Sequence, residues 1–180
     1  METEIATRQE KRAAAGKYLT FRLGDEEYGL EILRVREIIG LMDITPVPRT
    51  PDFIRGVINL RGRIIPVLNL RARFGLEQIE DHKRSCIIVM DAPWEGGTTQ
   101  VGIHVDSVRE VLAIQDEEIE PSPNLGHGVD TQFVLGVAKC KEGVRLLLDT
   151  TQILSPSEMD RVASTSKSEV PAGPGSSTAQ

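Results

Sequence analysis

The chain has 180 residues, with 27 acidic and 21 basic side chains and a formal net charge of −6. This length suits one ordinary domain or two very small ones packed together. The acidic balance and an aromatic content of 4% disfavour a dedicated polyanion-binding protein, which carries a basic excess and aromatic side chains for base stacking. No apolar run approaches the roughly 20 residues that span a bilayer, and the first residues lack the apolar core of a secretory signal, so we expect a cytoplasmic location.

The two ends of the chain differ in composition from its middle. Residues 1–16 are polar and alanine-rich without an apolar stripe, which predicts a flexible arm. Residues 160–180 are rich in Ser, Pro, Gly and Thr, which predicts a disordered tail. The folded part should therefore occupy residues 17–159.

The first strand signal is YLTFRL at 18–23, where leucine and phenylalanine alternate with tyrosine, threonine and arginine. A period of two predicts a half-buried strand. Gly24 and Asp25 predict a turn, and the alternation resumes at Tyr28.

The middle of the chain predicts a helical turn followed by a hairpin. The segment TPD at 50–52 resembles a helix N-cap followed by proline at the first helical position, so we expect one short helical turn there. The runs GVINL and RIIPVLNL flank Arg61 and Gly62 and predict a β-hairpin. Pro66 has no amide donor, which predicts an edge or a bulge at this position.

The second half of the chain repeats the same kinds of strand. Four further runs predict strands: SCIIVM, QVGIHV, FVLGVAKC and VRLLLD. We expect a final helix that begins near Asp149 or Thr150 and continues toward Val162.

The sequence also contains an internal repeat. Three pairs of segments carry it in the same order: YGLEILRVREII (28–39) with VGIHVDSVREVL (101–112), FIRGV (53–57) with FVLGV (133–137), and PVLN (66–69) with LLLD (146–149). The shared order predicts a duplicated small β unit, whose halves we call the first and second copies. Each copy is too small to bury much core alone, so the two should pack together, and closure into barrels would remove exposed strand edges.

Five arginines lie in or beside strand-like sequence of the first copy: Arg55, Arg61, Arg63, Arg71 and Arg73. Such a run suits a nucleic-acid surface, an anion clamp or a docking surface for another protein. The hairpin sequence NLRGR at 59–63 has KCKEG at 139–143 as its counterpart. The two copies thus share the strand framework but differ in the polar residues of this turn, which favours a site on the first hairpin.

Enzymatic chemistry has no support in the motifs. The chain has no phosphate-binding loop, no dinucleotide fingerprint and no nucleophile elbow. Cys86 and Cys140 form no C-x-x-C pair, and the histidines are isolated, so we expect no metal and no cofactor. An oligonucleotide-binding double barrel remains an alternative, because small β-barrels do bind oligonucleotides.

Protein recognition fits the arginines best, because a guanidinium pairs bidentately and its stem covers apolar surface. We expect Val35, Ile39 and Val57 to be exposed beside charged neighbours, forming a groove suited to a partner helix. An ion pair between Arg61 and Glu37 would fix the hairpin against the neighbouring strand and shape one wall of that groove.

Three segments resemble the CheW family of chemotaxis coupling proteins: FRLGDEEYGLEILRVREI, TPDFIRGVINLRGRIIPVLNLRARFG and VGIHVDSVREVL. The similarity extends over roughly residues 17–159. It implies a mainly β fold of two intertwined, SH3-like, five-stranded β-barrels with short helical turns and a C-terminal helix. We place the subdomains at about 25–80 and 84–150, with strand exchange at 17–24, and regard residues 92–99 as an insert in a hairpin turn.

The resemblance implies a non-catalytic adaptor for bacterial chemosensory arrays. Such an adaptor binds the regulatory domain of a CheA-type histidine kinase and the cytoplasmic tip of methyl-accepting chemotaxis receptors. It would bind no nucleic acid and would reach the membrane only through protein contacts. A related chemosensory scaffold or a separate kinase-regulatory domain is the alternative within this family.

The resemblance also implies receptor-groove residues. Val35, Glu37, Gly56 and Val111 fall on family positions for receptor coupling, Arg61 falls on the arginine that pairs with the glutamate matched by Glu37, and Asn59 belongs to the hairpin motif. Val57, from the apolar groove inferred above, completes the predicted set. The kinase-facing residues are not placed by this comparison.

Overall fold

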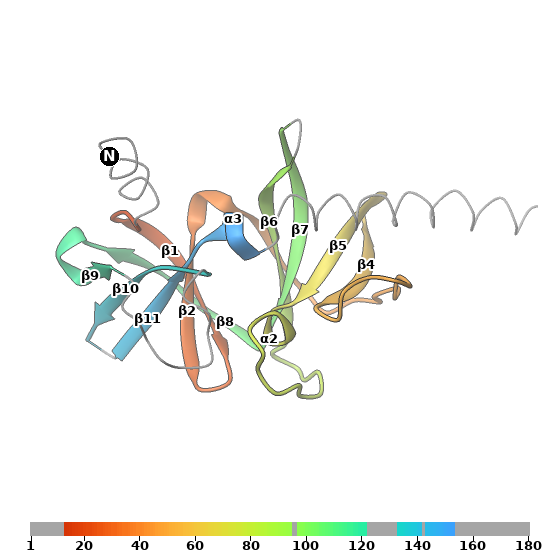
Figure 1. Cartoon of the computed structure of the whole chain (residues 1–180), viewed down its shortest axis with the longest axis horizontal. Helices are drawn as coiled ribbons and strands as arrows, with labels where there is room; N and C mark the ends of the chain where they lie inside the picture. Colours follow the sequence, from red (N-terminus) through yellow and green to blue (C-terminus); the bar gives the residue numbers. More distant parts are fainter. Residues whose placement is uncertain (1–12, 95–96, 122–132, 142, 154–180) are drawn as a thin grey trace, which may run out of the picture.

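The computed structural model describes residues 13–94, 97–121, 133–141 and 143–153. These residues form a mainly β protein of two sheets with a few short helices (Figure 1). The predicted tail at 160–180, most of the predicted arm and the predicted helix beyond Ile153 lie outside the described residues. No helix among the described residues is long and apolar enough to cross a membrane.

One sheet has six strands in the order β8-β1-β2-β11-β10-β9. Its strands are β1 (Gly16–Leu23), β2 (Glu26–Glu31), β8 (Ser107–Ile114), β9 (Ile119–Pro121), β10 (Val134–Cys140) and β11 (Gly143–Leu148). The other sheet has five strands in the order β3-β6-β7-β5-β4. Its strands are β3 (Val35–Gly40), β4 (Ile54–Leu60), β5 (Arg63–Asn69), β6 (Cys86–Trp94) and β7 (Gly97–Val105).

Short helical segments among the described residues connect or follow these strands. They are η1 (Ile32–Arg34), α2 (Leu70–Arg73), η2 (Asp116–Glu118) and α3 (Thr150–Ile153). The start of α3 confirms the predicted beginning of the last helix. The insert at 92–99 extends the β6–β7 ladder as far as the pair Trp94 and Gly97.

Each sheet contains strands from both copies of the repeat. In the six-stranded sheet, β2 of the first copy pairs in parallel with β11 of the second, with Gly29 opposite Leu147. In the five-stranded sheet, β7 of the second copy pairs in parallel with β5 of the first, with Gly102 opposite Val67. These are equivalent positions in the repeat, so the structure confirms both the duplication and the intertwined arrangement (Figure 1).

The equivalence extends to the fine structure of the two hairpins. Strands β4 and β10 have the same burial pattern, residue by residue. The Asn69 amide donates to the Phe53 carbonyl over 2.7 Å, and the Asp149 amide donates to the Phe133 carbonyl over 2.8 Å. Because these residues correspond in the repeat, the same backbone closure ends each hairpin.

Most of the buried apolar residues in the described part of the chain fall into three clusters. A large shared cluster joins the two sheets, and includes Phe21 and Leu30 from one and Ile88 and Ile103 from the other. Two smaller clusters fill the individual sheets. The six-stranded sheet holds Ala13, Tyr18, Ile114, Ile119, Ala138 and Leu147, and the five-stranded sheet holds Ile58, Ile65, Val67, Ile87 and Val89. Neither small cluster is a sufficient core, as the short repeat length predicts.

The prediction that 18–23 is half-buried is wrong. Tyr18 and Thr20, expected on the solvent face, are each 1% exposed. Tyr18 packs in the six-stranded sheet's own cluster, while the Thr20 hydroxyl donates to the Glu110 carbonyl over 2.8 Å. One face of β1 packs in the shared cluster through Leu19, Phe21 and Leu23, and Tyr18 on the other face packs in the six-stranded sheet's own cluster, so both faces are buried.

Two local predictions around the first hairpin also need correction. The segment 50–52 forms a turn, in which the Ile54 amide donates to the Pro51 carbonyl over 3.0 Å, and contains no helix. The helix instead follows the hairpin as α2, where the Asn69 side chain accepts from the Ala72 amide over 3.3 Å. Pro66 lies in an inner strand, but the β5–β7 pairing begins only at Val67, so the missing donor interrupts no ladder bond there.

Candidate functional site

The predicted docking hairpin is a tight two-residue turn between β4 and β5. Arg61 and Gly62 have φ values of 54° and 85°, and Leu60 pairs with Arg63 on either side of them. Positive φ at both central residues is the conformation that matches the twist of a two-residue hairpin. The Asn59 side chain accepts from the Gly62 amide over 2.8 Å and so holds the turn in place.

Glu37 and Arg61 form the predicted ion pair. Glu37 lies on β3 and Arg61 at the tip of β4–β5, although β3 and β4 are the two ends of the five-stranded order. The pair therefore spans the seam where this sheet closes on itself. The hydrogen bond to Glu37 raises the pKa of the Arg61 guanidinium, whose side chain remains 68% exposed.

The same seam is closed by backbone at Thr45. The Thr45 amide donates to the Val57 carbonyl over 2.8 Å, and the Val57 amide donates to the Thr45 carbonyl over 2.9 Å. Val57 is only 8% exposed, so its predicted exposure in a groove is wrong. Gly56 is also buried, and its position beside Thr45 gives it a structural role in closing the sheet.

The apolar side chains that the structure does expose are partly different from those predicted. Val35 and Ile39 are half-buried and pack against the shared cluster and the five-stranded sheet's cluster respectively. Val111 on β8 is 48% exposed, and Ile38 on β3 is 45% exposed. Ile38 was not predicted to be exposed. It aligns with Val111 in the internal repeat, so the alignment could have identified it.

The seven predicted residues are thus not one continuous cluster. Glu37 and Arg61 meet across the seam, and Gly56, Val57 and Asn59 follow one another along β4. Val111 belongs to the other sheet, where it pairs with Leu19 of β1.

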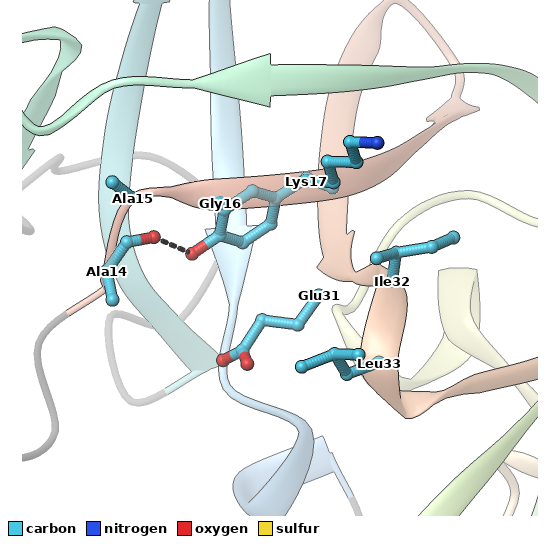
Figure 2. Close-up of a pocket in the computed structure, with 8 residues that line it drawn as sticks. Ala14, Ala15, Gly16, Lys17, Glu31, Ile32 and Leu33 are labelled. Atoms are coloured by element: carbon cyan, nitrogen blue, oxygen red, sulfur yellow. Dashed lines mark hydrogen bonds between the residues drawn. The ribbon is translucent and has the colours of Figure 1, made fainter.

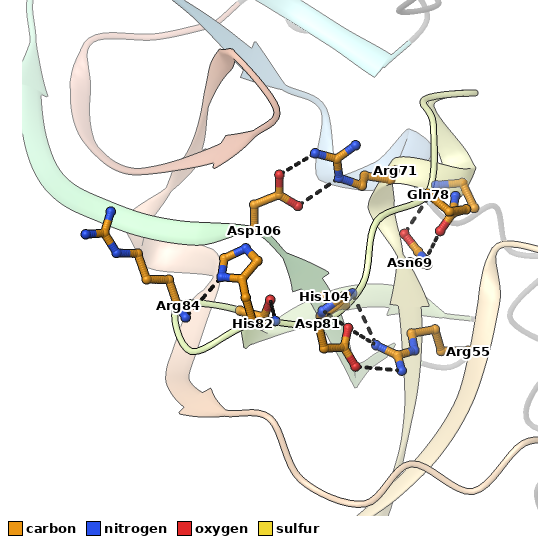
Figure 3. Close-up of polar contacts among 11 residues, drawn as sticks. Arg55, Asn69, Arg71, Gln78, Asp81, His82, Arg84, His104 and Asp106 are labelled. Atoms are coloured by element: carbon orange, nitrogen blue, oxygen red, sulfur yellow. Dashed lines mark hydrogen bonds and ion pairs between the residues drawn. The ribbon is translucent and has the colours of Figure 1, made fainter.

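Like Arg61, three more of the five arginines contact groups within the protein. Arg55 pairs with Asp81 through two contacts of 3.1 and 3.2 Å, and Arg71 pairs with Asp106 through two contacts of 2.8 and 2.5 Å (Figure 3). The Arg73 guanidinium stacks over aromatic rings. Arg63 is exposed on the hairpin. Guanidinium groups held in this way are a weak basis for a polyanion surface.

The Arg71–Asp106 pair also joins separate turns. Asp106 connects β7 to β8, and its carboxylate accepts from the Gly24 amide over 2.7 Å as well as from Arg71. Burial alone would raise the pKa of Asp106, but the hydrogen bonds from Arg71 and Gly24 outweigh burial and lower that pKa. Arg71 further donates to the Glu77 carbonyl over 2.6 Å, which anchors the chain leaving α2.

A buried histidine completes this polar region. His104 is 8% exposed, with Nδ1 3.4 Å from Arg55 and Nε2 3.3 Å from Asp81 (Figure 3). Because a guanidinium only donates, Nδ1 must accept, which leaves the proton on Nε2 facing Asp81. The Nε2 contact is an electrostatic approach that lacks hydrogen-bond alignment. Burial, followed by the charge of Arg55, lowers the pKa of His104.

A shallow pocket of about 90 Å³ lies between the start of β1 and η1 (Figure 2). Its lining includes Lys17, Glu31 and Leu33, and the Tyr18 hydroxyl donates to the Ala14 carbonyl over 2.6 Å. Cavities that enclose drug-sized molecules are several times larger. Among the described residues, no group of three or more His, Cys, Asp or Glu side chains could hold a metal ion.

Comparisons with known proteins agree on one family. Residues 17–158 match the CheW-like domain family. The chain is 38% identical over 152 residues to chemotaxis protein CheW of Klebsiella aerogenes, covering 84% of this chain and 89% of that protein. It is 36% identical over 140 residues to chemotaxis protein CheW of Rhizobium meliloti, covering 78% and 87%. The crystal structure of the scaffolding protein TtCheW from Thermoanaerobacter tengcongensis matches with a TM-score of 0.68 and 40% identity, over 75% of this chain and 89% of that one.

Proposed function

We propose, from the premise that the chain belongs to the CheW-like domain family of non-catalytic chemotaxis adaptors, that it binds two partners at once. One is the regulatory domain of a CheA-type histidine kinase, and the other is the cytoplasmic tip of methyl-accepting chemotaxis receptors. Its association with the membrane then runs through these protein contacts.

The observation that carries the receptor half of this proposal is a pair of exposed apolar side chains on terminal strands. Strand β3 ends the five-stranded order and carries Ile38, while β8 ends the six-stranded order and carries Val111. Ile38 pairs across strands with Ile88, and Val111 pairs with Leu19.

These pairings fix which way the two side chains face. Cross-strand partners lie on the same face of a sheet, and both Ile88 and Leu19 belong to the shared cluster. Ile38 and Val111 therefore lie on the faces that turn toward the junction of the two sheets. Exposed apolar side chains there suit the apolar stripe of a helical hairpin, which is the form of a receptor tip. Glu37 and Arg61 add a charged border beside β3.

The experiment measures binding of the full chain to purified receptor cytoplasmic fragments and, separately, to the kinase regulatory domain. Ile38→Glu and Val111→Glu should each weaken receptor binding, because each places a charge on an apolar contact. Val144→Glu is the matched control, since Val144 is 51% exposed on β11. If folded wild-type protein binds neither partner, the proposed partners are wrong; if only Val144→Glu weakens receptor binding, the proposed surface is wrong.

The oligonucleotide alternative gains no supporting observation. Phe21, Phe74 and Phe133 are each 3% exposed or less and lie in the shared cluster, where they are unavailable to stack on bases. The subdomain limits at about 25–80 and 84–150 remain predictions.

A further inference from the structure

Arg73 lies at the point where the two copies of the repeat meet. Its guanidinium carbon is 4.3 Å from the centre of the Phe53 ring and 5.0 Å from the centre of the Phe133 ring. Its Nε atom donates to the Ile153 carbonyl over 2.8 Å. One side chain therefore contacts the base of β4, the base of β10 and the end of α3.

The two phenylalanines are equivalent positions in the two copies. Phe53 precedes β4 in the five-stranded sheet, and Phe133 precedes β10 in the six-stranded sheet. The backbone of each phenylalanine is held in place, because the Phe53 and Phe133 carbonyls accept hydrogen bonds from the Asn69 and Asp149 amides. A group that contacts both rings thus connects the bases of the two hairpins directly.

This connection is not a general requirement of the duplicated fold. With Asn69 aligned to Asp149, the counterpart of Arg73 in the second copy is Ile153, which is 1% exposed in the shared cluster. Arg73 donates to the backbone of that counterpart. At these two equivalent positions, only the first copy therefore contributes a charged side chain to the junction.

Aromatic contacts continue from this junction into the six-stranded sheet. The Phe74 ring lies 5.2 Å from that of Phe133 and 5.5 Å from that of Tyr28, and Tyr28 stacks on Phe21 at 5.7 Å. The row starts beside Arg73 and ends on β1. Arg73 therefore lies at one end of a continuous row of packed aromatic rings.

We propose that Arg73 is a positioning residue that sets the orientation of the β4–β5 hairpin relative to the β10–β11 hairpin. This rests on the proposed function, because the orientation matters when one adaptor must engage a receptor and a kinase simultaneously. The residue touches neither partner in this scheme. It acts by keeping the two binding surfaces in a fixed relation.

Arginine suits this role better than lysine. A planar guanidinium stacks on aromatic rings while its edge N–H groups donate to a carbonyl, whereas an ammonium is a compact point charge. Arg73→Lys keeps the charge but loses the planar group, and Arg73→Met keeps an apolar stem without the cation. Arg84→Met is the control for loss of one positive charge, since Arg84 is exposed between α2 and β6.

The first measurement is of orientation and needs no partner. Backbone residual dipolar couplings should fit one common alignment tensor for both sheets of the wild type and of Arg84→Met. In Arg73→Lys and Arg73→Met, the two sheets should require different tensors while each sheet keeps its own internal fit. A single tensor that fits folded Arg73→Lys as well as wild type would overturn the inference, whether or not Arg73→Met folds.

The second measurement separates this inference from the proposed function. Binding of the kinase regulatory domain is measured with and without saturating receptor fragment. Arg73→Lys should keep each separate affinity within about twofold and lose about tenfold in affinity for forming the three-component complex. Unchanged three-component affinity overturns the inference. Failure of the wild type to bind either partner overturns the proposed function instead, and leaves the orientation measurement to decide the role of Arg73.

Discussion

Gly56 lies directly against the carbonyl group of Thr45. A Cβ atom at Gly56 would be 2.1 Å from the Thr45 oxygen and 2.7 Å from its carbonyl carbon, and the φ angle of Gly56 is +145°. Both obstacles are backbone, so no side-chain rotation relieves them. The neighbouring hydrogen bonds between Thr45 and Val57 depend on this close approach.

Gly56→Ala should therefore destabilise the protein by at least about 3 kcal/mol, through backbone strain and loss of the Thr45 closure. Urea unfolding measures this change. Gly40→Ala is the control, because a Cβ atom at Gly40 would have no heavy atom within 4 Å beyond its chain neighbours, and it should be nearly neutral. A folded, stable Gly56→Ala would contradict the structural role. A receptor-binding defect at Gly56 is informative about the groove only after this loss of stability has been measured.

The Glu37–Arg61 pair should show coupling that depends on salt. In a double-mutant cycle with Glu37→Gln and Arg61→Gln, the two single effects on the free energy of unfolding should not add up to the effect of the double substitution, because the two groups are in contact. The coupling should shrink at high ionic strength, since Arg61 is mostly exposed.

The cycle on Arg36 and Asp91 provides a comparison. These residues form an ion pair between β3 and β6, with contacts of 2.8 and 2.9 Å, and their coupling should fall with salt in the same way. Receptor binding separates the two cycles, because Glu37 and Arg61, unlike Arg36 and Asp91, are among the predicted receptor-groove residues. Equal effects of both cycles on receptor binding would argue against a specific role for Glu37 and Arg61.

Sequence reasoning succeeded where the signal was local or repeated. The turn at Arg61 and Gly62 and the alignment of Gly29 with Gly102 needed only nearby residues and the period of the repeat. It failed where the partner is distant in sequence. Val57 is buried because the chain at Thr45 returns to β4, and no pattern within β4 indicates that return.

The same limit applies to the arginines and to β1. Arg55 and Arg71 find Asp81 and Asp106, which are 26 and 35 positions away, so no local pattern identifies their partners. Strand β1 alternates like a half-buried strand, yet its two faces are buried in two different apolar clusters. The site prediction is accurate for the Glu37–Arg61 contact, whereas receptor binding by the seven residues remains a prediction.

His104 should make stability fall as the pH is lowered. Burial and Arg55 hold its pKa below the usual 6.5, so below that pH the unfolded chain binds a proton that the folded chain excludes. The contribution is fully present above the unfolded pKa and is lost as the pH falls toward the folded pKa. Protonation would also place an N–H on Nδ1 against the Arg55 guanidinium.

The measurement is the free energy of unfolding at about pH 7.5 and about pH 5.5 for wild type and His104→Gln. The wild type should lose more stability over this interval than the variant does. The charged and titratable groups facing His104 are Arg55, Asp81, Asp106 and His82. His82→Gln is the control, because His82 is exposed, and it should retain the wild-type pH dependence. Equal slopes for wild type and His104→Gln would refute the assignment.

The two equivalent glycines at the parallel strand pairs should respond unequally to the same substitution. A Cβ at Gly102 would be 2.7 Å from Ile87 Cγ2, whereas a Cβ at Gly29 would be 2.9 Å from Leu147 Cδ2. The leucine methyl lies at the far end of a flexible side chain. The isoleucine methyl is attached at Cβ, where branching restricts χ1, and Ile87 is fully buried.

Gly102→Ala should therefore cost about 2 to 3 kcal/mol by overpacking, and Gly29→Ala about 1 kcal/mol. Thermal or urea unfolding of the two variants tests the order. Ile87→Leu removes the offending branch while conserving side-chain volume, so it should restore part of the stability lost in Gly102→Ala and none of that lost in Gly29→Ala. If Gly29→Ala proves the more damaging variant, or if Ile87→Leu rescues both equally, the close packing of β7 against β6 does not set the cost. If the predicted order is found, both copies need glycine at this position because the neighbouring strand approaches closely. The neighbouring side chain, Ile87 or Leu147, then sets how much stability an added Cβ atom costs.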